Sequence, residues 1–236
     1  MKMIPMLSVI FCSLFFSFCS DADENPVQNK PLPENPKSLK FLALGDSYTI
    51  GESVCESCNF PEQLKMQLSA NIPNTVIHLK IIARTGWTTT NLKSAIETEN
   101  PSNDQDLVTL LIGVNNQYQN KPFSLYEQEF SELVSKSITL VKGDPNRVIV
   151  VSIPDYAFTP YGHGSSSISG EIDRYNNFAK NYCLQHNITF VDITDISRNG
   201  LNQPELVAND GLHPSESAYA KFVERLLPIA KQILSE

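Results

Sequence analysis

Short apolar runs alternate with helix-like segments along most of the chain, and this alternation limits the possible folds more than any other feature. Runs dominated by apolar residues have the length and composition of buried strands. Such an order predicts a parallel sheet with helices on both faces, the three-layer α/β/α sandwich of the α/β class. The five predicted strands are 39–44, 76–83, 107–112, 147–153 and 188–193, and the predicted helices are 60–69, 88–98, 124–141, 168–186 and 215–234.

The composition suits one globular domain and argues against a nucleic-acid partner. With 236 residues, the chain is long enough to bury a full hydrophobic core. Its formal net charge is -8 and it has no basic stripe, so it lacks the surface with which proteins bind phosphate backbones. The same charge gives no electrostatic attraction to anionic lipids.

The N-terminal segment does not fit the alternating pattern, and we predict a targeting sequence there. A mostly apolar stretch follows Lys2 and is shorter than the about 20 residues of a membrane-spanning helix. We therefore predict a signal peptide over residues 1–19. Its end resembles a bacterial lipoprotein signal, in which Cys19 would carry a lipid anchor and provide the only membrane contact. Cleavage after Ala22, without an anchor, is the alternative.

We predict that residues 20–38 form a linker between that signal and the folded domain. The segment is polar, has no periodicity and contains four prolines, so it cannot bury a core. The domain is then predicted to span residues 39–236. An exported protein of this kind would lie in the periplasm, at the outer membrane as a lipoprotein, or outside the cell.

Cys55 and Cys58 admit three interpretations. A redox motif would require a thioredoxin-like position after the first strand, and a zinc site would require a second ligand pair that the sequence does not show. In an exported protein we favour a local disulfide. Cys183 lies within an apolar-periodic helix and is predicted to be a buried free thiol.

Small or polar residues follow the predicted strands. Ser47, Gly86, Asn115 and Asp155 each lie just past one strand end. Because open parallel sheets bind ligands beyond the carboxyl ends of their strands, we expect these residues to meet there. Helix capping is an alternative for the polar cluster at Asp46 and Ser47, but capping does not explain the glycine-rich sequences after the other strands.

A nucleophilic serine needs a base, and the base needs a group that orients it. The histidines stand at positions 78, 163, 186 and 213, and only His213 has a carboxylate three residues before it, Asp210. Gly211 between them permits a tight turn. This spacing allows Asp210 to bind one imidazole nitrogen and leaves the other for Ser47. The alternative is a turn that merely caps the last helix, with Pro214 at its start.

Together these motifs resemble the SGNH (GDSL-type) hydrolases over residues 41–229, in the family's order and at strand ends. The likeness is to small bacterial secreted acylhydrolases, and the segment 55–59 departs from the family pattern. The four matching blocks are Gly45-Asp46-Ser47-Tyr48, Gly86, Gly113-Val114-Asn115 and Asp210-Gly211-Leu212-His213.

The resemblance implies a flavodoxin-like fold and a serine acyl transfer that needs no cofactor and no metal. Ser47 would attack an ester carbonyl, His213 would move the proton, and Asp210 would orient the imidazole. The oxyanion would bind to the Ser47 N–H, the Gly86 N–H and the Asn115 side chain. The α/β-hydrolase alternative needs a G-x-S-x-G elbow, which the sequence does not contain.

Other residues near these motifs are candidates for the pocket. Asp46 is expected to brace the turn before Ser47 rather than to take part in catalysis. Pro154-Asp155-Tyr156 is a candidate rim. Substrate-binding roles are predicted for Tyr48, Trp87, Asn116 and Tyr118, with core packing as the alternative for each.

We therefore expect an exported carboxylic-ester hydrolase acting on a small-molecule or glycan ester, such as an O-acetylated carbohydrate. The loops after the strands are polar and no long apolar lid is present, which favours a small acyl group. A lysophospholipase or thioesterase acting on longer acyl chains is the alternative. A non-catalytic glycan- or lipid-binding surface lipoprotein is the third possibility, and the complete set of site residues argues against it.

Overall fold

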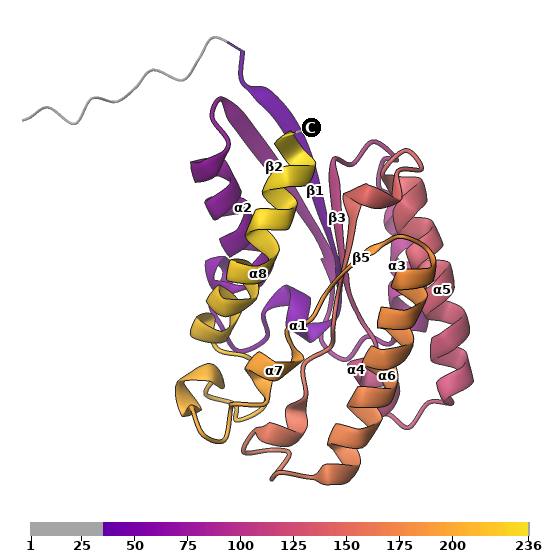
Figure 1. Cartoon of the computed structure of the whole chain (residues 1–236), viewed down its shortest axis with the longest axis vertical. Coiled ribbons are helices and arrows are strands. Elements are labelled where there is room, and N and C mark those ends of the chain that lie inside the picture. Colours follow the sequence, from indigo (N-terminus) through magenta and orange to yellow (C-terminus); the bar gives the residue numbers. More distant parts are fainter. Residues whose placement is uncertain (1–34, 236) are drawn as a thin grey trace, which may run out of the picture. The chain divides into compact units, whose positions relative to one another are not determined.

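A five-stranded parallel sheet forms the centre of the domain in the computed structural model, which describes residues 35–235 (Figure 1). Its order is β2-β1-β3-β4-β5, the doubly wound order in which the direction of winding reverses beside β1. Such sheets form a crevice at the carboxyl ends of the strands on either side of that reversal. The strands are β1 (Lys37–Gly45), β2 (Thr75–Ala83), β3 (Leu107–Leu111), β4 (Val148–Val151) and β5 (Thr189–Val191).

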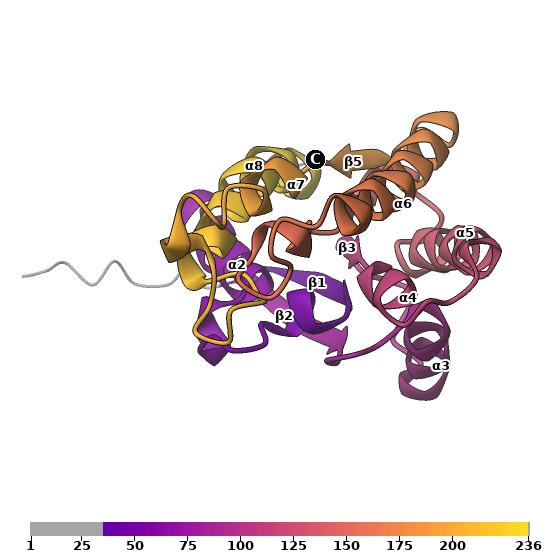
Figure 2. The ribbon, with the colours of Figure 1, turned by 90° about the horizontal axis from the view of Figure 1, so that it is seen from below.

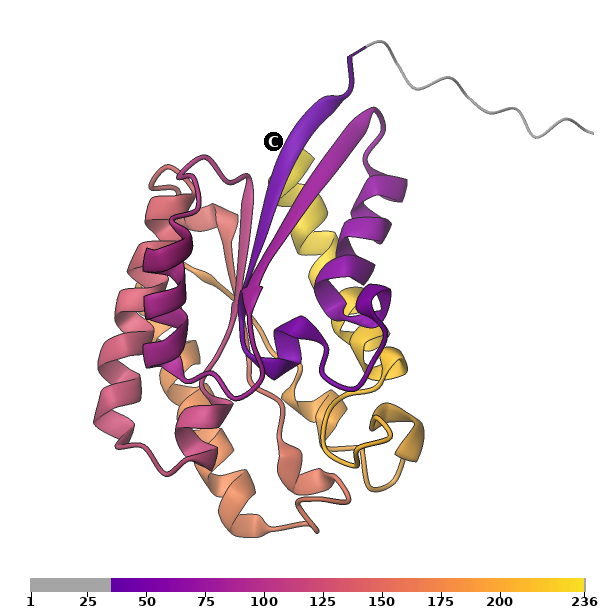
Figure 3. The same ribbon diagram turned by 180° about the vertical axis from the view of Figure 1, so that it is seen from behind.

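Long helices cover both faces of this sheet. On one face, α2 (Phe60–Asn71) packs against α8 (Glu216–Ser235) (Figure 2). The opposite face is covered by α3 (Thr89–Glu99), α5 (Phe123–Leu140) and α6 (Ser166–Gln185) (Figure 3). The predicted three-layer α/β/α arrangement is confirmed. Because both faces are covered, β3 and β4 are buried along their whole length, as their apolar sequences predict.

Each predicted strand and long helix is present, with shifted ends. β1 begins at Lys37, ahead of its predicted start, because the Lys37 N–H donates to the Asn74 carbonyl at 2.8 Å and the strand pairs from there with β2. The strand therefore includes the last residues of the predicted linker.

Three short helices were not predicted, because periodicity needs a window of about 11 residues or more. They are α1 (Ser47–Ile50), α4 (Val114–Tyr118) and α7 (Thr194–Ser197). Each begins just after a strand, so all three lie at the carboxyl edge of the sheet, the end that Figure 2 faces. Single 3-10 turns occur at Glu56–Cys58, Pro145–Arg147, Tyr156–Phe158 and Pro204–Leu206.

The cysteines of the described residues behave as predicted. Cys55 and Cys58 form a disulfide. Cys183 is a free and fully buried thiol, and burial raises its pKa to about 12. The segment that holds Cys19, Ala22, the predicted signal peptide and most of the predicted linker lies outside the described residues.

The described residues contain neither a candidate membrane-spanning helix nor a candidate metal site. Between residues 35 and 235, no helix is long and apolar enough to cross a membrane. Over the same range, no group of histidine, cysteine, aspartate and glutamate side chains is arranged to hold a metal ion.

Candidate active site

Ser47 lies at the point where β1 ends and α1 begins. Gly45 allows the sharp exit from the strand, because a Cβ on it would lie 2.0 Å from the Thr49 Oγ1 and 2.5 Å from the Leu111 carbonyl oxygen. Asp46 then caps α1, since its Oδ1 accepts the Tyr48 N–H at 3.0 Å. Ser47 is thus the first residue of the helix, where backbone N–H groups have no acceptor within the helix.

The carboxyl group of Asp46 is fully buried beside the nucleophile position. Burial raises its pKa to about 7, because the charged form loses its hydration. The N–H of Tyr48 and the nearby amide of Asn115 act in the opposite direction without cancelling that effect. Its second oxygen, Oδ2, has no partner at hydrogen-bond distance in the described part of the chain. The predicted role of Asp46 in bracing the turn agrees with this capping geometry.

Asp210 and His213 meet in a tight turn ahead of α8. The distance between Asp210 Oδ2 and His213 Nδ1 is 2.6 Å. The other oxygen, Oδ1, accepts the N–H groups of Leu212 at 2.9 Å and His213 at 3.0 Å. Gly211 has a φ of +72°, which favours glycine. The sequence left open whether this segment forms a tight turn or an Asp210–His213 pair. The structure contains both, because the turn itself brings the two side chains together.

The hydrogen bonds around Asp210 keep its carboxylate charged. Partial burial would raise its pKa, but the hydrogen bonds from the His213 ring, the N–H groups of His213 and Leu212, and the Ser53 hydroxyl together hold it well below its ordinary value. Ser53 donates its Oγ–H to Asp210 Oδ2 at 2.7 Å. Ser53 could not be predicted from the sequence, because a lone serine 157 positions away from its partner belongs to no pattern.

Gly86 and Asn115 follow β2 and β3, and side-chain amides from the segment after β3 bind backbone carbonyls of the Gly86 turn. The Asn115 Nδ2 donates to the Trp87 carbonyl at 3.1 Å. The Gln119 Nε2 donates to the Gly86 carbonyl at 2.8 Å. Asn115 in α4 and Gln119 just after it therefore hold the Gly86 turn at two points. Gly86 itself has a φ of +81°, which a residue with a side chain rarely adopts.

A cavity of about 180 Å³ opens between these loops. Its walls are mostly apolar, and a few polar groups converge in it, as is typical of ligand sites. The segments that follow β1, β2, β3 and β4 contribute to it, together with the turn before α8. The lining residues are Ser47, Tyr48, Thr85, Gly86, Val114, Asn115, Tyr118, Tyr156, Leu212 and His213.

Of the four predicted pocket residues, Tyr48 and Tyr118 line this cavity. Asn116, for which core packing was the alternative, does not line it. It is fully buried, and its amide exchanges hydrogen bonds with the backbone N–H and the hydroxyl of Thr89, at 2.9 and 2.7 Å. Trp87 is also absent from the lining, and its carbonyl rather than its ring contacts the site.

Three lining residues were not predicted from the sequence: Thr85, Val114 and Leu212. All three are neighbours of residues in the recognised motifs. Whether a neighbour of a motif residue faces the cavity depends on the exact turn of a short loop or helix. Segments this short show no periodicity from which the direction of each side chain could be predicted.

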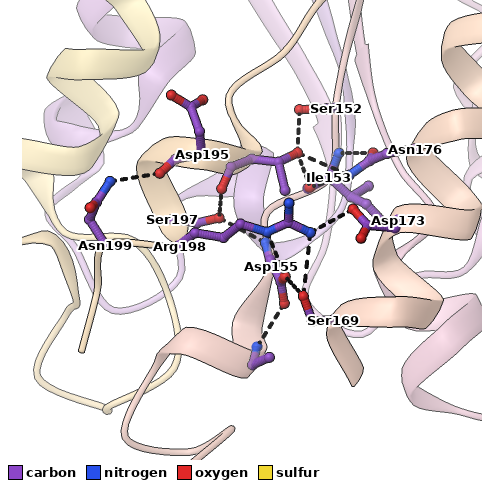
Figure 4. Close-up of polar contacts among 12 residues, drawn as sticks. Ser152, Ile153, Asp155, Ser169, Asp173, Asn176, Asp195, Ser197, Arg198 and Asn199 are labelled. Atoms are coloured by element: carbon purple, nitrogen blue, oxygen red, sulfur yellow. Dashed lines mark hydrogen bonds and ion pairs between the residues drawn. The ribbon is translucent and has the colours of Figure 1, made fainter. Parts of the chain in front are cut away.

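A buried ion pair supports the rim of the cavity. Asp155, which follows β4, is fully buried, and its Oδ2 accepts from Arg198 Nε at 2.9 Å and from Ser169 Oγ at 2.6 Å (Figure 4). Its Oδ1 accepts the Ala157 N–H at 3.0 Å, within the turn that carries Tyr156. Asp155 therefore holds the rim in place and does not line the cavity, whereas Tyr156 does.

Comparison with known proteins identifies the family to which the chain belongs. The sequence matches the model of the GDSL-like lipase/acylhydrolase family over residues 43–221. A search of curated proteins for similar sequences found no match.

Solved structures share the fold at low sequence identity. Axe2, an acetylxylan esterase from Geobacillus stearothermophilus, is 22% identical with a TM-score of 0.65, over 83% of this chain and 95% of Axe2. A member of the lipolytic G-D-S-L family from Veillonella parvula is 18% identical with a TM-score of 0.62, over 80% and 97% of the two chains. The psychrotrophic esterase EstA from Pseudoalteromonas sp. is 18% identical with a TM-score of 0.58, over 84% and 99%.

Proposed function

Because the chain belongs to the GDSL-like lipase/acylhydrolase family and is a carboxylic-ester hydrolase, we propose that it is an exported serine esterase that removes small acyl groups from carbohydrates. One observation carries the proposal: His213, held by Asp210 at 2.6 Å, lines the same cavity as Ser47 and the two predicted oxyanion residues. A serine and an imidazole at one cavity, with a charged carboxylate bound to the imidazole, are the parts that acyl transfer requires.

The acylation step follows from the tautomer that Asp210 imposes. Because Asp210 accepts the proton on His213 Nδ1, Nε2 is the nitrogen left to take the proton of the Ser47 hydroxyl. Ser47 Oγ then attacks the ester carbonyl carbon, and the low pKa of Asp210 keeps it negative beside the imidazolium that forms. His213 returns the proton to the leaving alcohol. Water repeats the cycle on the acyl-enzyme and releases the acid.

Three hydrogen-bond donors would stabilise the negative charge that develops on the carbonyl oxygen. Two are the backbone N–H groups of Ser47 and Gly86. The third is Asn115, whose Nδ2 has two hydrogens: one binds the Trp87 carbonyl and orients the amide, and the other is available for the oxyanion. Removing one such donor typically lowers kcat by about 10²–10³-fold.

The size of the cavity supports a small acyl group. Pockets that enclose drug-sized ligands have volumes of about 300–1,000 Å³, whereas this cavity measures about 180 Å³. Lysophospholipase or thioesterase activity on long chains would need a longer apolar groove. The small volume therefore favours an acetyl or similarly short group.

A cluster of three tyrosines supports a carbohydrate as the alcohol part. Tyr118, Tyr156 and Tyr161 lie with ring centroids 6.0 to 6.3 Å apart, and the first two line or border the cavity. The hydroxyls of Tyr118 and Tyr161 are 2.7 Å apart, and both residues are 48% exposed. Exposed rings with polar tips suit a sugar, whose C–H face packs on the ring while its hydroxyls bind the phenols. The acetylxylan esterase Axe2 shares this fold, which is in keeping with such a substrate.

Export is supported by the Cys55–Cys58 disulfide. Disulfides persist in oxidising compartments and are rare in the cytosol. Together with the predicted signal peptide, this bond favours a location in the periplasm, at the outer membrane through Cys19, or outside the cell.

Ser47→Ala tests the chemistry. The variant should lose hydrolysis of p-nitrophenyl acetate and covalent labelling by a fluorophosphonate probe, while its circular dichroism spectrum stays that of the wild type. An unlabelled wild-type protein would instead support the non-catalytic lipoprotein. Turnover retained by the folded variant would overturn the assignment of the nucleophile.

The substrate class is tested with p-nitrophenyl esters from acetyl to palmitoyl and with acetylated oligosaccharides. The ratio kcat/KM should be highest for acetyl. Tyr161→Ala should raise KM for the oligosaccharides and leave hydrolysis of p-nitrophenyl acetate unchanged. A preference for palmitoyl esters would instead support the lysophospholipase or thioesterase alternative.

A further inference from the structure

One surface loop contacts two separate parts of the site. Residues 51–58, which we call the bridging loop, run from the end of α1 to the 3-10 turn before α2. The loop begins directly behind the nucleophile, because the N–H groups of Gly51 and Glu52 both donate to the Ser47 carbonyl at 3.0 Å. None of the four blocks that carry the family resemblance covers this loop.

The first contact of the bridging loop is with the carboxylate that orients the base. Ser53 Oγ and His213 Nδ1 both bind the same oxygen of Asp210, at 2.7 and 2.6 Å. With the two backbone N–H groups on Oδ1, Asp210 receives four hydrogen bonds. Ser53 is the only one of these donors that comes from outside the Asp210–His213 turn, so it fixes that turn relative to α1.

The second contact is with the turn that carries the Gly86 N–H. The Thr85 hydroxyl donates to the Glu52 carboxylate, so adjacent residues of the bridging loop hold the two sides of the site. Thr85 itself lines the cavity.

The bridging loop is anchored firmly enough to act as a support. The Cys55–Cys58 disulfide closes its far end. The buried Asn59 donates from Nδ2 to the carbonyls of Ile50 at 3.3 Å and Glu56 at 2.8 Å, which ties both ends of the loop together. Gly51 makes this possible, because its φ is +82° and a Cβ there would lie 2.6 Å from Asn59 Cβ. Ser53 also has a positive φ, +67°, which indicates that the loop holds it in a fixed conformation.

We infer that Ser53 is a positioning residue for the acyl-transfer reaction, whose hydroxyl holds the Asp210 carboxylate in register with His213 and Ser47. This inference rests on the proposed function, in which Asp210 orients the base. Ser53 does not line the cavity, so it acts on the rate of the chemical step through Asp210 and not on substrate binding.

Two variants separate the hydroxyl from the backbone. Glycine and asparagine both adopt positive φ readily, but only asparagine offers a side-chain donor to Asp210. Ser53→Gly should lower kcat about tenfold, the equivalent of about 1.4 kcal/mol, with KM for p-nitrophenyl acetate unchanged. Ser53→Asn should recover most of that loss. Wild-type kcat in Ser53→Gly would overturn the inference, and so would an equal loss in both variants.

A double variant provides a test that a merely structural role would fail. If Ser53 acts through Asp210, then Ser53→Gly should have no further effect on kcat in the Asp210→Ala background, because coupled residues are not additive. An additional tenfold loss in that background would overturn the inference. Wild-type kcat in Asp210→Ala alone would instead overturn the triad of the proposed function, so the two failures are distinguishable.

The Glu52 contact is tested in the same way. Glu52→Gln retains an oxygen that accepts from the Thr85 hydroxyl, and Glu52→Ala does not. The alanine variant should show a lower kcat than the glutamine variant, with both folded at 25 °C. Equal kcat values in the two variants would confine the positioning role of the bridging loop to Ser53.

Discussion

The ionisation of Asp46 couples folding to pH. Its pKa is about 7 in the fully buried site and 3.8 when unperturbed. Because the folded-state value is raised, the folded chain keeps a proton that the unfolded chain releases. Stability from this group is therefore full below about pH 4 and declines as the pH rises to about 7, by on the order of 4 kcal/mol.

Asp46→Asn should remove this dependence. The free energy of unfolding of the variant, minus that of the wild type, should increase between pH 4 and pH 7 and stay constant above it. Urea denaturation at a series of pH values measures the difference. Glu97→Gln, at an exposed position of α3, is the control and should show no such change. A difference for Asp46→Asn that does not vary with pH would contradict the prediction.

The residues that could be predicted from the sequence are those that stand in contiguous motifs at strand ends. Ser47, Gly86, Asn115 and His213 meet at one cavity, because parallel strands deliver their carboxyl ends to one edge. The predicted resemblance to the SGNH (GDSL-type) hydrolases is confirmed by the family match. The position of Asn116 could not be predicted in the same way. It adjoins Asn115, but one further step around α4 turns its amide into the protein interior.

At the scale of elements, burial made the strands predictable and hydrogen bonding set their ends. The nearly all-apolar run 107–112 predicts β3 well, because a strand covered on both faces tolerates few polar side chains. The start of β1 was predicted less well, because Lys37 and Ser38 are exposed and only their backbone pairing extends the strand. The short helices α1 and α4 contain too few residues to show a period.

The Cys55–Cys58 bond should stabilise the bridging loop measurably. A disulfide across so short a loop contributes about 2 kcal/mol by restricting the unfolded chain. The double variant Cys55→Ser/Cys58→Ser should therefore unfold at a lower urea concentration. Its kcat should also fall, since Ser53 then has a looser support.

Dithiothreitol supplies the matched control. The reductant should shift the urea midpoint of the wild type toward that of the double variant and should leave the variant itself unaffected. Cys183 does not complicate the comparison, because it is buried and already reduced. An equal effect of the reductant on both proteins would contradict the role assigned to the disulfide.

At the scale of the whole molecule, the position of the enzyme in the cell should depend on Cys19. A lipid chain contributes about 0.8 kcal/mol of membrane affinity for each buried methylene group. The wild type should incorporate labelled palmitate and sediment with the membrane fraction of a bacterial host. Cys19→Ser should lose the label and become soluble. Equal fractionation of the two proteins, both without label, would instead favour cleavage after Ala22.

The packing of α8 against α2 joins the two ends of the domain, because α2 follows the serine and the turn with Asp210 and His213 leads into α8. A ribosome makes Ser47 well before it makes His213, the proposed base. In the proposed mechanism a chain that ends before residue 210 lacks both the base and the carboxylate that orients it, and it should therefore not hydrolyse esters.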